Sequence, residues 1–269
     1  MALLEVANLR RSFGGLVALQ DLSFAVDPGR IKAVIGPNGA GKTTLFNVIC
    51  GLLKPDTGQV TFRGRSLAGL DACRIARAGL ARTFQTPSLF PRLSVLENVM
   101  IGRHARARGE FAACALRWPG QAREERRIRQ AALAQLEYVG LAGLAGCAAG
   151  ALAFGQRRMA ELGRALATEP ELLLLDEPAS GLNTKEKEEL GELLGRIRRG
   201  GITILLVEHD MSLVMGLSDE ILVLHNGVSI AEGPPALVQN DPKVIGVYLG
   251  GESPHVASGK ESQVRLREP

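Results

Sequence analysis

A glycine-rich loop that ends in a lysine is the clearest chemical feature of the sequence. The segment GPNGAGKT at 36–43 fits the pattern G-x-x-x-x-G-K-[ST] and follows the apolar run Ile31–Ile35. Glycines let backbone N–H groups curl around a phosphate chain, while Lys42 supplies a point charge and the Thr43 hydroxyl binds Mg²⁺. A glycine-rich turn could match this pattern by accident. The strand before the loop and the expected helix after it favour a nucleotide phosphate site.

Two adjacent carboxylates follow a second apolar run. The segment ELLLLDEP places Asp176 and Glu177 directly after four leucines. A carboxylate at the carboxyl end of a buried strand, beside a phosphate loop, is placed to hold Mg²⁺. Its neighbour can orient or deprotonate an attacking water. The alternative is a strand that ends in two solvated acids.

Three further residues have less specific signals. His209 follows the apolar run ITILLV, at the end of another expected strand of the same sheet. Its imidazole could bond a γ-phosphate or the attacking water, although a lone histidine is more often structural. Gln85 could ligate Mg²⁺ or water, but the residues around it favour a plain polar junction. Phe13 is either a core aromatic or a platform for an adenine ring.

The segment ALAFGQRRM at 151–159 contains no acid, histidine or nucleophile. It is typical of a loop that enters a helix, with Arg157 and Arg158 facing water. Because backbone N–H groups at a helix N-terminus bind anions, it predicts a second anion site more than a hundred residues after the phosphate loop.

Composition narrows the class of protein. The chain of 269 residues has 46% hydrophobic and 22% charged residues, and its net charge of only +4 is too weak to argue for nucleic acid as a partner. Its four cysteines form no CxxC pair, so we expect reduced core thiols. The N-terminus does not resemble a signal peptide. The apolar runs are too short to span a bilayer.

The distribution of apolar residues predicts an α/β fold. Four short apolar runs, at 31–35, 172–175, 202–207 and 221–224, suit a sheet buried on both faces. The alternating stretches before residue 70 suit an antiparallel β portion. From about 86 to 164 the pattern becomes helical, with Ile128, Ala132, Leu136 and Val139 at helical spacing. We therefore expect one domain over 1–250 with a helical insert, an irregular exposed segment near RARGEFAACALRWPGQ, and a polar, disordered tail over 251–269.

Taken together, the motifs closely resemble the ATP-binding subunits of ABC transporters, over roughly residues 3–250. The segments FQTPSLFPRLSVLENVMIGRH, DEPASGLN, VEHDMSLVMGLSD and DPKVIGVYLG resemble the LivG type, from bacterial importers of branched-chain amino acids. ATPases of urea import and lipopolysaccharide export are near relatives. The resemblance implies a P-loop core of the RecA type with an antiparallel β subdomain and a helical insert.

The resemblance also implies a role for each matching residue. The ATP-binding residues would be Phe13, Gly36, Pro37, Asn38, Gly39, Ala40, Gly41, Lys42, Thr43 and Thr44. Lys42, Glu177 and His209 would be catalytic, with Glu177 as the base. Mg²⁺ would be held by Thr43, Gln85 and Asp176. The signature, which contacts the ATP of a partner subunit, would be Leu152, Ala153, Phe154, Gly155 and Gln156. The D-loop would be Ala179, Ser180, Gly181, Leu182 and Asn183.

The sequence departs from the family pattern at three of these positions. Ala153 replaces the usual signature serine, Asn183 replaces the usual D-loop aspartate, and Phe13 replaces the common tyrosine. None of these changes removes a catalytic group. Ala153 lacks the hydroxyl that would touch the γ-phosphate.

The resemblance further implies partners and a location. Two ATPase subunits, identical or homologous, would meet head to tail around two ATP molecules. Two transmembrane permease subunits would contact the chain near Gln85 and the helical insert, at the cytoplasmic face of the bacterial membrane, and a binding protein would act indirectly.

Two other classes of ATP- or GTP-dependent protein fit the sequence less well. A kinase or GTPase would need an acceptor pocket or a guanine-reading motif, and we find neither. A soluble ABC ATPase acting on nucleic acid or ribosomes would resemble a tandem pair of ATPase domains or carry long coiled coils, and the sequence has neither.

Overall fold

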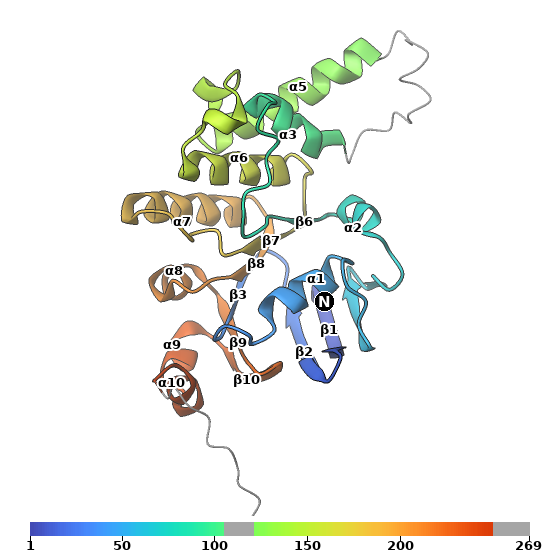
Figure 1. The fold of residues 1–269 in the computed structure, drawn as a ribbon, viewed down its shortest axis with the longest axis vertical. Coiled ribbons are helices and arrows are strands. Elements are labelled where there is room, and N and C mark those ends of the chain that lie inside the picture. The colour runs from blue at the N-terminus through green and yellow to red at the C-terminus, as the bar shows by residue number, and fades with distance from the viewer. Residues whose placement is uncertain (105–120, 250–269) are drawn as a thin grey trace, which may run out of the picture.

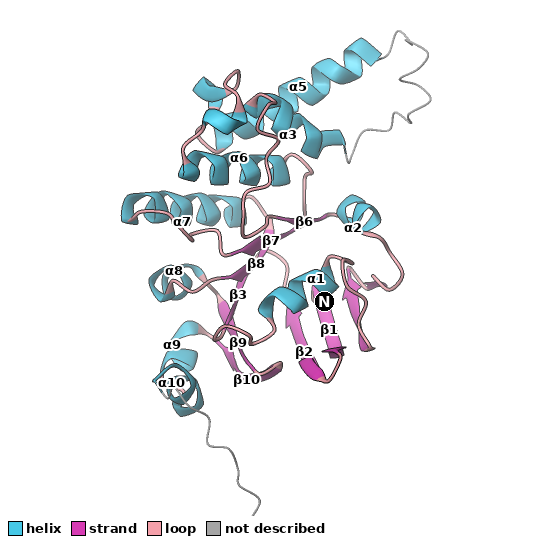
Figure 2. Cartoon of the chain, viewed as in Figure 1, coloured by secondary structure: helices cyan, strands magenta, loops and turns pink. Residues whose placement is uncertain are grey.

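The structure of the protein is a computed structural model, and it describes residues 1–104 and 121–249. The segment expected to be irregular and exposed, and the polar tail, lie outside these residues. Figure 1 shows a larger sheet with helices on both of its sides, a smaller sheet beside it, and the helices α3 (Val95–His104), α5 (Gln121–Tyr138) and α6 (Phe154–Leu166) grouped at one end. Figure 2 shows the same view by secondary structure.

The antiparallel sheet comes from the N-terminal part of the chain. Its strands are β1 (Leu4–Phe13), β2 (Leu16–Val26), β4 (Thr57–Phe62) and β5 (Arg65–Ser66), in the order β2-β1-β4-β5. Along β1, Leu4, Val6 and Leu9 are buried, so one face of this sheet packs on the core. This agrees with the alternating pattern of the sequence.

The six-stranded sheet has the order β10-β9-β3-β8-β7-β6. Its central strands coincide closely with the apolar runs of the sequence: β3 (Ile31–Ile35), β7 (Leu172–Asp176), β8 (Thr203–Val207) and β9 (Glu220–His225). β6 (Leu80–Arg82) and β10 (Val228–Gly233) form the edges. The pairs of β3, β6, β7, β8 and β9 are parallel, and β10 runs antiparallel to β9. The carboxyl ends of the central strands therefore meet at one edge, where ligands of such sheets bind.

Both faces of this sheet are covered. On β7, Leu172 and Leu174 pack toward α1 (Lys42–Ile49) and the antiparallel sheet, while Leu173 and Leu175 pack toward α7 (Thr184–Arg199). Beside β3 and β9 the second face is covered by α8 (Met211–Leu217), α9 (Pro235–Gln239) and α10 (Pro242–Leu249). Burial on both faces explains why these strands are continuously apolar.

A group of helices packs on one end of the core. It contains α3 (Val95–His104), α5 (Gln121–Tyr138) and α6 (Phe154–Leu166), with short 3₁₀ turns at Ala142–Leu144 and Ala149–Ala151. The four residues that the sequence placed on one face of α5 and its end are all buried: Ile128, Ala132, Leu136 and Val139. α2 (Ala72–Ala78) precedes the edge strand β6. Among the described residues, no helix is long and apolar enough to cross a membrane.

The expectation of core thiols is correct for only one described cysteine. Cys50 is buried at the end of α1, and burial raises the pKa of its thiol to about 11. Cys73 and Cys147 are exposed. All three are free. Cys114 lies outside the described residues.

Candidate functional site

The phosphate loop joins β3 to α1 in a conformation that only glycine permits at its first position. Gly36 has φ +147°, and a Cβ there would lie 2.0 Å from the carbonyl oxygen of Leu224. Lys42 begins α1, and its ammonium donates to the carbonyl oxygens of Gly36 (2.7 Å) and Pro37 (2.9 Å). The loop thus encloses a cation at the N-terminus of a helix, where backbone donors also point outward.

Lys42 is nearly enclosed by the protein. Only 6% of the residue is exposed, and this burial lowers the pKa of its ammonium, while the nearby carboxylates of Glu177 and Asp176 act in the opposite direction. The sequence placed these three groups at the same edge of the sheet, and the structure brings them together there. Their proximity creates a cation beside two anions at the mouth of the loop.

The two carboxylates after β7 have different surroundings. Asp176 is buried and pairs with the guanidinium of Arg82 at 2.8 Å. Glu177 has a left-handed backbone (φ +48°), which turns its side chain away from the strand direction. Its Oε2 accepts from the Gln85 amide at 2.8 Å, and its Oε1 lies 2.9 Å from His209 Nε2. Glu177 is thereby oriented by two side chains that come from different loops.

The contact between Gln85 and Glu177 corrects the interpretation of Gln85 as a plain polar junction. Gln85 lies three residues after β6, and parallel pairing of β6 with β7 brings the two strand ends together. Two residues with structural roles were missed in the sequence. Arg82 bridges Asp176 and the Asn47 amide oxygen (2.7 Å), and buried Glu208 accepts from the backbone N–H of Ala179 at 2.7 Å. Their partners are far away in the chain, so no local pattern indicates them.

A hollow of about 550 Å³ lies above the phosphate loop. Phe13, Leu16, Gln85 and Glu177 line it, together with residues of the loop itself. The Phe13 ring is 43% exposed, with the guanidinium of Arg11 4.8 Å from its centroid. Phe13 is therefore not a core aromatic, and an exposed ring of this kind can stack on a flat heterocycle.

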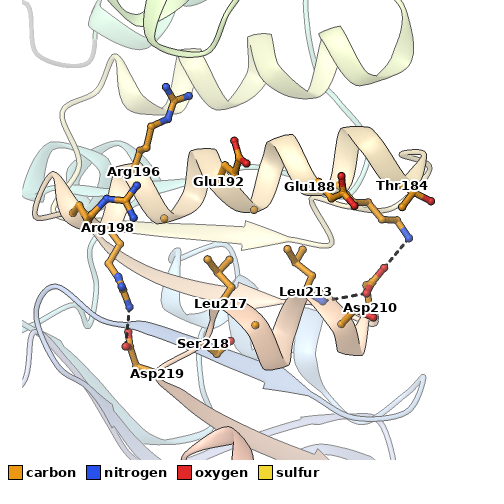
Figure 3. A pocket seen from close by; sticks show the side chains of 16 residues that line it. Thr184, Glu188, Glu192, Arg196, Arg198, Asp210, Leu213, Leu217, Ser218 and Asp219 are labelled. Carbon is orange, nitrogen blue, oxygen red and sulfur yellow. Dashed lines mark hydrogen bonds and ion pairs between the residues drawn. The ribbon is translucent and has the colours of Figure 1, made fainter.

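A wider groove of about 1100 Å³ lies elsewhere, between α7 and α8 (Figure 3). It contains none of the residues of the phosphate loop. Two ion pairs lie within it, since Lys187 bonds Asp210 at 2.7 Å and Arg198 bonds Asp219 at 2.8 Å. The groups capable of chemistry gather instead in the hollow above the loop.

The segment at 152–156 is not part of that hollow. Ala153 is the N-cap of α6 and offers no side-chain acceptor, while its own N–H donates to the Gln156 side chain at 3.0 Å. This is one half of a capping box. Leu152 is buried, and Phe154 is 44% exposed. The structure thus separates this helix N-terminus from the phosphate loop of the same chain.

The prediction that both arginines after the segment at 152–156 face water is wrong for one of them. Arg157 is exposed, as expected, and donates to the carbonyl oxygen of Leu152 at 2.9 Å. Arg158 is only 5% exposed, and its guanidinium donates to the carbonyl oxygens of Phe84 and Gln85. It falls on the buried stripe of α6, with Gly155 and Leu162.

The loop at 179–183 connects the acidic strand end to α7. Asn183 is the N-cap of α7, and it accepts from the Glu186 N–H at 3.0 Å, while its own N–H donates to the Glu186 carboxylate at 2.9 Å. The full capping box shows that asparagine satisfies the helix end without the charge of the usual aspartate.

These features define a P-loop domain built to bind and hydrolyse a nucleotide, with a second helix N-terminus held on a separate helical group. A family model described as "ABC transporter" matches residues 19–180, and one described as "Branched-chain amino acid ATP-binding cassette transporter" matches residues 230–253. The chain belongs to the ABC transporter family, and it is an ATP-hydrolysing subunit of that family.

Relatives and solved structures agree with this assignment. The high-affinity branched-chain amino acid transport ATP-binding protein LivG of Salmonella typhimurium is 44% identical over 92% of this chain and 98% of its own. The ADP conformation of an ATP-binding cassette of an ABC transporter is 34% identical, with a TM-score of 0.82 over 93% of this chain and 99% of its own. A dimeric cassette bound to ADP and Pi is 26% identical, with a TM-score of 0.73 over 86% and 98%.

Replacement of Lys42 by alanine is expected to weaken ATP binding by roughly tenfold to a hundredfold, because it removes a charge-assisted contact worth about 1.5–3 kcal/mol. Titration with a fluorescent ATP analogue measures the change. Lys54→Ala, which removes an exposed lysine beyond the same helix, is the matched control. An affinity equal to that of the wild type in Lys42→Ala would exclude Lys42 from the phosphate site.

Proposed function

We propose that the chain is the ATP-binding and ATP-hydrolysing subunit of a bacterial importer for branched-chain or other hydrophobic amino acids. The observation that carries this proposal is the match of residues 230–253 to a family model specific to branched-chain amino acid cassettes. The described part of this region forms the end of β10, α9 and α10. The name of the LivG relative points to the same substrate class.

The residues around the phosphate loop fit ATP with Mg²⁺. Thr43, Asp176 and Gln85 offer a hydroxyl, a carboxylate and an amide oxygen, and such hard oxygen ligands suit Mg²⁺. When bound, the metal would neutralise charge on the phosphates. The side chain of Asp176 is held in position by its ion pair with Arg82. Phe13 would stack on the adenine ring, and the residues from Gly36 to Thr44 would surround the phosphates.

The remaining groups supply the hydrolytic chemistry. Glu177 would accept the proton of the attacking water, with Gln85 and His209 holding its two oxygens in place. Lys42 would exchange the carbonyl oxygens of its own loop for phosphate oxygens. Most of the catalysis then comes from positioning and charge stabilisation, as in other phosphoryl transfers.

The position of the signature supports a head-to-tail dimer. Since the N-terminus of α6 lies outside the hollow of its own chain, it would complete the site of a second subunit, either identical or homologous. The dimeric form of a related cassette supports such an assembly. The residues Leu152 to Gln156 would contact the γ-phosphate of the partner's ATP through backbone N–H groups. The D-loop, from Ser180 to Asn183, would lie at the same interface.

A cavity beside Gln85 supports a contact with the permease. It measures about 280 Å³ and lies between β6, α2, α3 and α6. Its rim includes the exposed side chains of Leu52, Phe84 and Ile101. A cytoplasmic helix of one transmembrane subunit would contact this cavity, holding the chain at the inner face of the membrane. The binding protein would act on it only through the permease.

Affinity purification from membranes tests the proposal. We expect the tagged chain to co-purify with two permease subunits and an ATPase subunit, and to stay in the soluble fraction when the permease is absent. Uptake assays with radiolabelled leucine then test the substrate. Uptake of urea instead, or co-purification with lipopolysaccharide-export components or ribosomes, would contradict the amino-acid assignment.

Glu177→Gln is expected to lower steady ATP hydrolysis by about a hundredfold or more, because a general base contributes about 10²–10⁴-fold. ATP affinity should stay within a few-fold of the wild type, and ATP should trap the closed dimer. Phosphate release and size-exclusion chromatography measure the two effects. Glu188→Gln, on the exposed side of α7, is the control. Hydrolysis at the wild-type rate in Glu177→Gln would refute its role as the base.

Ala153→Ser is expected to strengthen ATP-driven dimerisation by roughly fivefold, since a serine N-cap contributes about 1 kcal/mol and its hydroxyl would reach the partner's γ-phosphate. The dimerisation constant is best measured by sedimentation in the Glu177→Gln background. Ala151→Ser, two residues earlier and also exposed, controls for added polarity. Equal dimerisation of Ala153→Ser and its parent would show that the missing hydroxyl is already compensated.

A further inference from the structure

Arg158 is a buried cation that no carboxylate pairs with among the described residues. Its Nη1 donates to the carbonyl oxygen of Phe84 at 2.9 Å, and its Nη2 donates to that of Gln85. Burial lowers the pKa of the guanidinium, while the fields of Glu161 and Glu208 favour its charged form. The planar fork of the arginine therefore holds two successive carbonyls of one loop.

The same guanidinium contacts the signature. Its central carbon lies 5.4 Å from the centroid of the Phe154 ring, within the range of a cation–π interaction. Arg158 thus bridges the backbone at 84–85, which belongs to the loop after β6, and an aromatic side chain at the N-terminus of α6. A lysine could not make these contacts together, because it is a point charge on a flexible stem.

Phe154 in turn packs against the D-loop. A Cβ at Gly181 would lie 2.8 Å from Cε1 of the Phe154 ring, so only a glycine permits this close contact. The next residue of α6 is equally tight, since a Cβ at Gly155 would lie 2.4 Å from a Glu186 carboxylate oxygen. The start of α6 is therefore wedged against the start of α7.

We propose that Arg158 is a positioning residue that links the loop of Gln85 to the signature and the D-loop through Phe154. A displacement of the Gln85 backbone changes the position of the guanidinium, and the Phe154 ring carries that change to Gly181. Contact with the permease at Gln85 thereby reaches the nucleotide interface without passing through bound nucleotide. This inference rests on the proposed transport function, because it needs a permease that acts at Gln85.

The test uses the complete transporter, reconstituted with its permease, its second ATPase subunit and its substrate-loaded binding protein. The readout is the ratio of ATP hydrolysis in the complex to hydrolysis by the ATPase subunits alone, together with KM for ATP and the thermal midpoint. Arg158→Lys and Arg158→Ala are compared with Arg196→Lys. Arg196 is a matched control, because it also lies 5.4 Å from an aromatic ring, that of Tyr138, and donates to a carbonyl oxygen.

Arg158→Lys is expected to lower this ratio by about fivefold or more, within the usual range of coupling between sites. KM for ATP and the thermal midpoint should stay near the wild-type values, and Arg196→Lys should behave as the wild type. Phe154→Leu should lower the ratio as well, and adding Arg158→Lys to it should cause little further loss, because both changes break one connection.

Two results would overturn the role of Arg158. The first is a wild-type ratio in Arg158→Lys, including the case in which the rates of the complex and of the ATPase subunits alone fall equally, which indicates a structural defect only. The second is full additivity of the two substitutions. A wild-type complex with no stimulation by permease would instead overturn the proposed function, so the two failures are distinguishable. If Arg158→Ala does not fold, Arg158→Lys decides.

Discussion

The two adjacent carboxylates at the end of β7 impose the main constraint on the site, because each must have its own partners. Asp176 forms an ion pair with Arg82, and the two side chains are only 5% and 7% exposed. Glu177 turns away through a left-handed backbone and is held by Gln85 and His209. Removing one partner of a buried ion pair typically costs about 3–5 kcal/mol, because it leaves the other charge buried without compensation, so Asp176 and Arg82 each require the other.

Arg82 also contacts two neighbouring elements of the site. Its guanidinium reaches Asn47 of α1 and lies 5.5 Å from the Phe46 ring and 5.0 Å from the Phe84 ring. One side chain of the edge strand β6 thereby fastens the helix of the phosphate loop to the acidic end of β7. Gln85, three residues later, reaches Glu177 because β6 pairs with β7. Arg82 adds a side-chain connection beside the proposed catalytic groups, although it touches no nucleotide in the proposed mechanism.

Much of this arrangement could be predicted from the sequence. The α/β fold and the family assignment are confirmed, and the apolar runs coincide with β3, β7, β8 and β9 because strands buried on both faces must be continuously apolar. The partner of Gln85 could not be predicted, since 92 residues separate it from Glu177. Arg158 was misplaced because its charge suggested water, although its spacing from Gly155 and Leu162 puts it on the buried stripe of α6. The prediction relied on the charge of the side chain, whereas its position on the helix gave the correct answer.

The N-terminus of α6 shows how a bound nucleotide can complete a helix end that the sequence leaves without a cap. A serine N-cap would accept from a backbone N–H of the first turn and would stabilise the helix before any nucleotide binds. In this chain the side chain of Gln156 accepts from the Ala153 N–H, while no side chain caps the donors that follow. The helix therefore lacks part of its capping energy in the separate subunit. Under the proposed dimer these donors face the partner's γ-phosphate, so nucleotide binding would supply the cap that the sequence omits, and closure would stabilise this helix end as well as the interface.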